Sequence, residues 1–215
     1  MLPDMAESKR KRRDAEAART EILDAAEKRL ASAGPSGIRL QEVAADVGMS
    51  HPTVLHHFGS REALVEAVIS RALRAINTRL VEAIQASRGD EVELAGMLEA
   101  VFDAMETAGH ARVLLWLALE GRHVSGDQVT LSAVVDATHT LRESQRGRGK
   151  APPREDSAHL VVLSALVLTS LPVLGPSLLR NSGMGHDAEA MRHFRAFLAR
   201  LLLRHVSPDV SSPKM

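Results

Sequence analysis

The sequence predicts an all-α protein of about nine helices. Aromatic residues make up only 2% of the 215 residues and tyrosine is absent, so residues that favour strands are scarce. Long stretches are rich in Ala, Leu, Glu and Arg, which favour helices. Hydrophobic residues make up 45% of the chain, which is enough for one or two compact domains with a buried core.

Glycines separate the first predicted helices. Apolar residues recur at spacings of three and four over residues 14–33, which predicts one face of a first helix that ends at Gly34. A short second helix is expected over residues 40–47, where Gly48 is placed to end it in a left-handed conformation. A tight turn therefore follows the second helix.

The next two predicted helices both follow a serine. Ser50 is a suitable N-cap for a short third helix, which has Pro52 in its first turn and ends before Gly59. Ser60 is the expected cap of a longer fourth helix that continues to roughly Ala86.

The rest of the chain also predicts helices, joined by loops rich in Gly and charged residues. The expected ranges are 92–107, 111–122, 128–146, 157–179 and 187–205. Residues 146–156 combine Gly, Pro and charges, which predicts a mobile loop. Residues 207–215 are expected to form a flexible tail.

The composition excludes several kinds of chemistry. No cysteine is present, which rules out disulfides, thiol catalysis and Cys-based metal sites and fits a reducing cytoplasm. Residues 160–175 form the longest apolar run, but they fall short of a membrane span, so we expect a buried helix and no membrane partner. No phosphate loop, nucleophile elbow or metal-ligand spacing occurs, so neither an enzyme nor a cofactor is expected.

Charge is balanced overall but unevenly placed. The chain has 27 basic and 27 acidic residues, so any affinity for a polyanion depends on local clusters. Residues 9–13 read KRKRR, within an N-terminal arm expected over residues 1–13. The arm is either a disordered, solvated tail or a segment that lies along DNA phosphates, and both interpretations stay open.

Two short helices joined at Gly48 and supported by a first helix match the helix-turn-helix pattern over residues 39–58. The second helix of this motif lies in the major groove of DNA. Val43, Val47 and Val54 can form the small core that fixes the angle between the helices. The candidate DNA contacts are Arg39, Ser50, His51, Pro52, Thr53, His56, His57 and Arg61.

Three of these candidates are histidines, which raises two other possibilities. His51, His56 and His57 are separated by five and one residues and do not share the spacing of four that helical metal ligands use. A catalytic histidine would need a nucleophile or carboxylate partner, and this segment supplies none. DNA contact is therefore preferred, with a merely solvated polar surface as the alternative.

The N-terminal quarter resembles the TetR-type family of bacterial transcriptional regulators. The motifs that carry the resemblance are T-x-I-L-x-A-A at residues 20–26, Gly37, V-A-x-x-V-G-M-S at 43–50 and H-H-F-G-S-R-E-A-L at 56–64. The resemblance implies double-stranded DNA as a partner and repression that is relieved when a small effector binds. The scarcity of aromatic residues favours an apolar effector of the aliphatic or acyl type. It implies two successive α-helical regions: a DNA-binding domain over residues 14–62, and a larger ligand-binding and dimerisation domain over 63–206.

The sequence departs from the family pattern at several positions. Ile38 and Arg39 stand where the second helix usually begins with Ser or Thr, so that cap is lost. Leu55 replaces a tyrosine that commonly contacts the DNA backbone. Arg61 replaces a lysine, and the expected phosphate contact would be kept.

The resemblance also implies a homodimer built from the last two long helices and an effector pocket among the central ones. The expected dimer contacts are Leu160, Leu163, Val167, Leu171, Phe194, Phe197 and Leu201. The expected pocket residues are Met97, Phe102, Met105, Trp116, Leu119, Glu120, His123 and Val134. The same residues could instead pack a single monomeric core. Two rival functions also stay open: a DNA-binding protein without an effector, and a small-molecule binder or enzyme with a vestigial motif.

Overall fold

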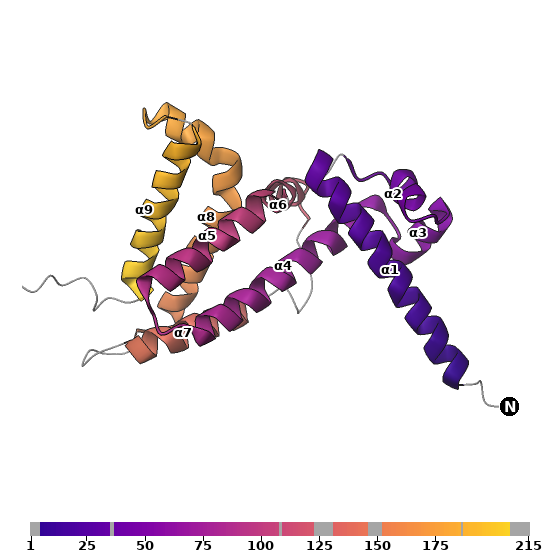
Figure 1. The fold of residues 1–215 in the computed structure, drawn as a ribbon, viewed down its shortest axis with the longest axis horizontal. Helices are drawn as coiled ribbons and strands as arrows, with labels where there is room; N and C mark the ends of the chain where they lie inside the picture. The colour runs from indigo at the N-terminus through magenta and orange to yellow at the C-terminus, as the bar shows by residue number, and fades with distance from the viewer. Residues whose placement is uncertain are drawn as a thin grey trace, which may run out of the picture. The chain divides into compact units, whose positions relative to one another are not determined.

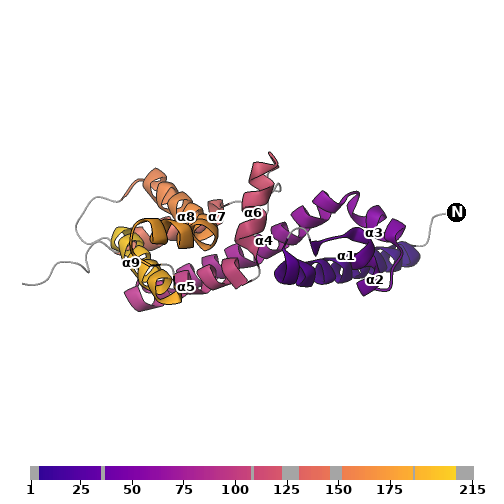
Figure 2. The ribbon, with the colours of Figure 1, turned by 90° about the horizontal axis from the view of Figure 1, so that it is seen from above.

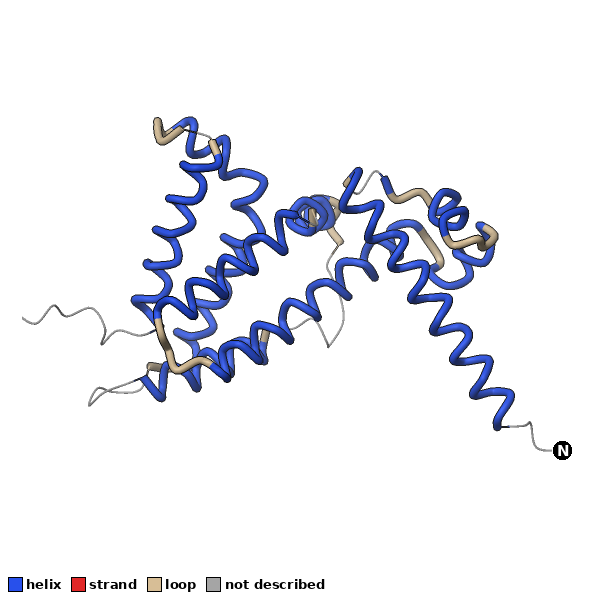
Figure 3. Tube along the Cα trace, viewed as in Figure 1, coloured by secondary structure: helices blue, strands red, loops and turns tan. Residues whose placement is uncertain are grey.

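The structure is a computed structural model that describes residues 5–34, 37–107, 109–122, 131–145, 152–185 and 187–206. Over these residues the chain forms nine helices and no strand (Figure 3), which confirms the predicted all-α class. In chain order the helices are α1 (Met5–Ala33), α2 (Leu40–Asp46), α3 (His51–Phe58), α4 (Arg61–Ala86), α5 (Glu91–Thr107), α6 (His110–Leu119), α7 (Ser132–Gln145), α8 (Arg154–Asn181) and α9 (Ala188–Val206) (Figure 1).

Two helices begin three or more residues earlier than predicted. α1 begins at Met5, so residues 5–13 belong to a helix and do not form an arm that precedes it. Lys, Arg, Ala and Glu dominate this stretch and all favour helices. α8 begins at Arg154, so the end of the predicted loop is helical. Pro153 at the N-cap and two acidic residues in the first turn favour this start. Residues 1–4, 128–130, 146–151 and 207–215 lie outside the described residues.

The chain divides into two compact units, Met1–Arg71 and Ala72–Met215. The boundary falls inside α4, several residues after the position predicted at 62–63. Leu64, Val65 and Val68 are fully buried. Arg71 pairs with Asp24 of α1, with Nη1 2.6 Å from Oδ1. The first part of α4 therefore completes the N-terminal unit.

Ion pairs join α1 to α2 in the first unit. Nη2 of Arg29 donates to Oδ1 of Asp46 at 2.9 Å, and Nε donates to Oδ2 at 2.5 Å. The same guanidinium also pairs with Glu42 of α2. A bidentate arginine–carboxylate pair fixes orientation as well as distance, so Arg29 sets how α2 lies on α1.

In the second unit, α8 and α9 lie side by side, and α5 packs against both (Figure 2). Arg195 of α9 is buried and pairs with α5, where Nη1 lies 3.3 Å from Oδ1 of Asp103 and a second contact is made to Glu106. Its guanidinium carbon lies 5.0 Å from the ring centroid of Phe102. These contacts explain how a buried arginine is accommodated between two helices.

A second buried arginine, Arg142 of α7, joins α7 to its neighbours. Its guanidinium donates to Oδ2 of Asp156 at 2.5 Å, to Oγ of Ser157 at 2.8 Å and to the main-chain oxygen of His205 at 3.0 Å. α7, α8 and α9 are therefore held together at one point by a single side chain.

α8 is less buried than the sequence predicted. It is long and apolar enough to cross a membrane by length and composition, with a mean hydropathy of 2.0 over its most apolar window, of which 22% is buried. The expected buried helix is therefore only partly correct. Core helices of other proteins pass the same test, and the exposed leucines of α8 are described with the dimer candidates below.

Candidate DNA-binding surface and ligand cavity

The turn between α2 and α3 depends on Gly48. Its φ of +65° is left-handed, a conformation that a side chain disfavours. The amide of Gly48 donates to the main-chain oxygen of Ala45 at 3.2 Å, and the amide of Met49 donates to the main-chain oxygen of Ala44 at 2.9 Å. These bonds satisfy carbonyls at the end of α2, as expected for a glycine after a helix.

The start of α3 is capped by Ser50, as predicted. The amide of Thr53 donates to Oγ of Ser50 at 3.2 Å, and the two hydroxyl oxygens lie 2.8 Å apart. Pro52 lies in the first turn, where no helical amide bond is lost. Ser50 and Thr53 were both candidates for DNA contact, and the structure shows that each also has a structural hydrogen bond.

One face of α3 is buried and the other is polar and exposed. Val54 and Phe58 are buried, whereas His51, Pro52 and His56 are exposed. Thr53 and His57 are half-buried. His56 and His57 form an edge-to-face pair with ring centroids 5.9 Å apart. The described residues contain no group of three or more potential ligands that could hold a metal ion.

Arg19 of α1 holds the C-terminal end of α3, a contact that was not predicted from the sequence. Its Nη1 donates to the main-chain oxygen of His57 at 3.0 Å, and its guanidinium carbon lies 4.2 Å from the ring centroid of Phe58. An arginine suits this position because the last carbonyls of a helix have no helical partner.

The two arginines expected to contact phosphate have different environments. Arg39 is 74% exposed and lies 3.2 Å from Glu42, and it makes no side-chain cap to α2, as predicted. Arg61 instead donates from Nε to the main-chain oxygen of Ile38 at 2.7 Å. This contact ties the start of α4 to the segment before α2, so Arg61 has a structural role that was not predicted. Leu55 is 40% exposed and offers no hydrogen-bonding group.

The ion pair that joins α2 to α1 depends on pH, because the Asp46 carboxylate must be ionised to form it. A hydrogen bond from Arg29 lowers the pKa of Asp46 below its usual value, although desolvation opposes the shift. The same hydrogen bond raises the pKa of Arg29. The helix that supports α3 is therefore held by a pair that needs an ionised carboxylate.

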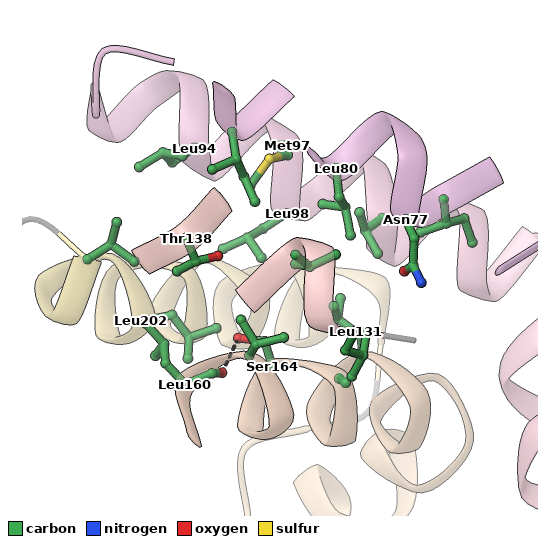
Figure 4. A pocket seen from close by; sticks show the side chains of 18 of the residues that line it. Asn77, Leu80, Leu94, Met97, Leu98, Leu131, Thr138, Leu160, Ser164 and Leu202 are labelled. Atoms are coloured by element: carbon green, nitrogen blue, oxygen red, sulfur yellow. Dashed lines mark hydrogen bonds between the residues drawn. The ribbon is translucent and has the colours of Figure 1, made fainter. Parts of the chain in front are cut away.

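The second unit contains a cavity of about 150 Å³ (Figure 4). Five helices supply its lining residues. They are Leu73, Ile76, Asn77, Leu80 and Ile84 of α4; Leu94, Met97, Leu98, Val101 and Met105 of α5; Leu131 just before α7 and Val134, Thr138 and Leu141 within it; Leu160, Val161, Ser164, Ala165, Leu168 and Thr169 of α8; and Leu202, Leu203 and Val206 of α9. The wall is almost entirely apolar, and no charged side chain is among these residues.

The predicted pocket residues divide into two groups. Met97, Met105 and Val134 line the cavity. Phe102, Trp116, Leu119 and Glu120 are not among its lining residues: Phe102 is buried beside Arg195, and Leu119 is 88% exposed at the end of α6. His123 lies outside the described residues. The lining residues of α4 were missed, although their spacing of three and four continues the apolar side of that helix.

The predicted dimer residues are also divided. Leu163, Phe197 and Leu201 are exposed, whereas Leu171 is only 6% exposed and belongs to the unit's own core. Leu160, Val167 and Phe194 are partly buried and pack against the cores. Three exposed leucines of α8 were not predicted: Leu166, Leu174 and Leu178. We call the exposed apolar residues of these two helices the α8–α9 stripe: Val162, Leu163, Leu166, Leu174, Leu178, Phe197 and Leu201.

These features define a class of protein: a helical protein with an N-terminal helix-turn-helix. Residues 22–68, from α1 into α4, match the family model of bacterial regulatory proteins of the TetR family. The HTH-type transcriptional regulator BetI of Rhizobium meliloti is 24% identical over 153 residues, which cover 71% of this chain and 75% of BetI.

Solved structures show the same fold. A structure from Mesorhizobium loti assigned to the TetR family has a TM-score of 0.59 at 19% identity, covering 88% of this chain and 96% of the other. A TetR-family transcriptional regulator from Streptomyces coelicolor has a TM-score of 0.52 at 21% identity, covering 90% of each chain. The match over residues 22–68 and the similarity to BetI support a TetR-type transcriptional regulator, and the solved structures show that the fold is shared.

Proposed function

We propose that the protein is a repressor that binds a near-palindromic operator as a homodimer and leaves it when a small apolar molecule occupies the cavity of the second unit. The observation that carries this proposal is α3, a short helix capped at its start, held at its end, and exposing polar side chains on one face. A rigid helix of this kind suits insertion into the major groove.

The proposed DNA contacts are the side chains that the DNA-binding unit exposes and that carry suitable hydrogen-bonding or apolar groups. His51 and His56 are exposed on α3 and carry groups that can hydrogen-bond to base edges. Thr53 can present its methyl group to a thymine while its hydroxyl stays bonded to Ser50. Arg39 is the more available of the two predicted phosphate contacts, because Arg61 is bound to Ile38.

A homodimer would cover the α8–α9 stripe. Regulators of this type bind DNA and typically act as dimers. Seven apolar side chains on two adjacent helices are exposed, which is unusual for a surface that stays in water. In a symmetric dimer the same stripe of each copy would meet its mate. Two copies of α3 could then enter successive major grooves, about 34–36 Å apart.

Effector control is supported by α4, because one part of this helix lines the cavity and the other part belongs to the DNA-binding unit. Leu73, Ile76, Asn77, Leu80 and Ile84 of this helix line the cavity, and its first residues belong to the core of the DNA-binding unit. A ligand that shifts α4 would change the separation of the two reading helices and weaken operator binding. Reciprocity requires that operator DNA weaken ligand binding by the same factor.

Selection of bound sequences from random duplex DNA tests the proposal. The purified protein would be used at about 150 mM salt, which suppresses nonspecific binding. We expect enrichment of a motif with two-fold symmetry. A folded protein that enriches no sequence would overturn the assignment, and a single asymmetric half-site would overturn the dimeric part of it.

A further inference from the structure

The polar groups of the cavity wall are few and uncharged. Only Asn77, Thr138, Ser164 and Thr169 among the described lining residues carry a polar side chain. An unpaired charge in such a wall is strongly disfavoured, because nothing there replaces its hydration. A ligand's hydrogen-bonding groups must therefore meet one of these side chains or go unsatisfied.

Two of the three hydroxyl groups that line the cavity already donate hydrogen bonds within α8. Oγ of Ser164 donates to the oxygen of Leu160 at 2.9 Å, as Figure 4 shows, and Oγ1 of Thr169 donates to that of Ala165 at 2.8 Å. Thr138 of α7 differs: it is 7% exposed, lines the cavity and has no hydrogen-bond partner among the described residues. Its oxygen is not among the fully buried polar atoms that lack a partner, so it can be reached from the cavity and can bond a ligand there.

A cation lies one turn beyond Thr138 but is already engaged. Arg142, four residues on, donates to Asp156, Ser157 and the main-chain oxygen of His205. An anionic ligand could use this guanidinium only by displacing the Asp156 carboxylate, whose pKa is held down by its hydrogen bond from Arg142. Asp156 is therefore the resident anion of this arginine.

We propose that the cavity selects an uncharged, largely apolar molecule whose one hydrogen-bonding group meets the hydroxyl of Thr138, and that it rejects carboxylates of similar size. The inference rests on the proposed effector role of the cavity and adds the chemical class of the ligand. A cavity of about 150 Å³ matches in volume one known to hold benzene, so it holds roughly six to eight non-hydrogen atoms.

The test compares three small alicyclic probes by calorimetric titration of the full-length protein at pH 7.5. The probes are cyclohexanol, methylcyclohexane and cyclopentanecarboxylate, which have seven, seven and eight non-hydrogen atoms. Cyclohexanol should bind at least about tenfold more tightly than the carboxylate. Thr138→Val, which keeps the side-chain shape, should weaken cyclohexanol about three- to tenfold and leave methylcyclohexane unchanged, because only the hydrogen bond is removed.

Thr169→Val is the matched control, since it makes the same change in the same cavity at a hydroxyl already donated to the helix. It should alter cyclohexanol binding less than about twofold. A second readout keeps the test independent of ligand binding: Thr138→Val should leave the thermal midpoint of the unliganded protein equal or higher, because no hydrogen bond within the protein is lost.

Each other outcome overturns the inference. Carboxylate binding as tight as cyclohexanol binding would show that Arg142 is accessible, and equal losses in the two valine variants would show that Thr138 has no special role. Binding of none of the three probes would reject this ligand class. Operator affinity is measured on the same preparations. A protein that binds its operator but gives one of these results would contradict only the ligand class, whereas a protein that binds no operator would contradict the proposed function.

Discussion

Arg19 of α1 donates a hydrogen bond to the main-chain oxygen of His57, 3.0 Å away, and so holds the C-terminal end of α3 to the first helix. The same guanidinium lies over the ring of Phe58. α3 is thus fixed at both ends, by Ser50 at its start and by Arg19 at its end.

Arg19→Ala should lower the free energy of unfolding by about 1–2 kcal/mol, through loss of the hydrogen bond and of the cation–π contact. Urea denaturation followed by circular dichroism measures the change. Arg13→Ala, at an exposed position of the same helix, is the control and should change stability little. Equal stability of both variants would show that Arg19 does not hold α3.

Asp46→Asn should make the first unit less sensitive to acid. The pKa of Asp46 is lower in the folded protein than in the unfolded chain, so its pair with Arg29 stabilises the protein above the unfolded pKa and is lost as pH falls through the folded one. The stability difference between wild type and Asp46→Asn should therefore be largest near neutral pH and shrink below about pH 4. Denaturation at pH 7 and at pH 3.5 tests this, with exposed Asp14→Asn as control. A difference that grows in acid would contradict it.

Arg61→Ala should destabilise the first unit by about 1–2 kcal/mol, because the oxygen of Ile38 loses its donor. Arg61→Lys should recover part of the loss. Thermal unfolding and DNA affinity would be measured on the same samples. Unchanged stability with weaker binding to all DNA would instead assign Arg61 to a phosphate contact, as the sequence first suggested.

His56→Ala should reduce the preference for operator over scrambled duplex by about 1–3 kcal/mol, the range for one base contact. Fluorescence anisotropy at constant salt gives both affinities. His205→Ala replaces an exposed histidine at the end of α9 and is the matched control. If both variants keep the full preference, the exposed face of α3 does not read the sequence at this position.

Leu166→Glu should convert the proposed dimer to a monomer, since it places a carboxylate within the α8–α9 stripe, and operator affinity should fall with it. Sedimentation velocity measures the oligomeric state. Val92→Glu introduces the same charge at a residue that is 79% exposed outside the stripe, and it should stay dimeric. A wild-type monomer, or a dimeric Leu166→Glu, would exclude the stripe as the interface.

The DNA-binding motif could be predicted because its signals are local. Gly48, Ser50 and Ser60 act on the backbone within a few residues of themselves, so their roles do not depend on distant contacts. The contacts of Arg19 and Arg61 join residues 38 and 23 positions apart, and no local pattern reports such pairs. That is why Arg61 was assigned to phosphate alone.

The cavity and the stripe were only partly predicted, for a related reason. α8 is apolar on nearly all sides, so periodicity could not show that Leu171 faces the core while Leu166 faces outward. Trp116 and Leu119 are large apolar residues in a central helix, yet the described residues that line the cavity belong mainly to α4, α5, α7, α8 and α9. Which helices enclose a space depends on packing across the chain, which a single sequence does not reveal.

α3 contains no lysine or arginine. A reading helix of this composition adds little of the sequence-independent attraction to phosphates with which random chromosomal DNA competes for a regulator. Occupancy of a single site in a genome depends on the ratio of specific to nonspecific affinity, multiplied by the number of competing sites. The sequence-independent part of the affinity would then come from cations outside α3, such as the exposed Arg39, while α3 itself would act mainly on the ratio of specific to nonspecific binding.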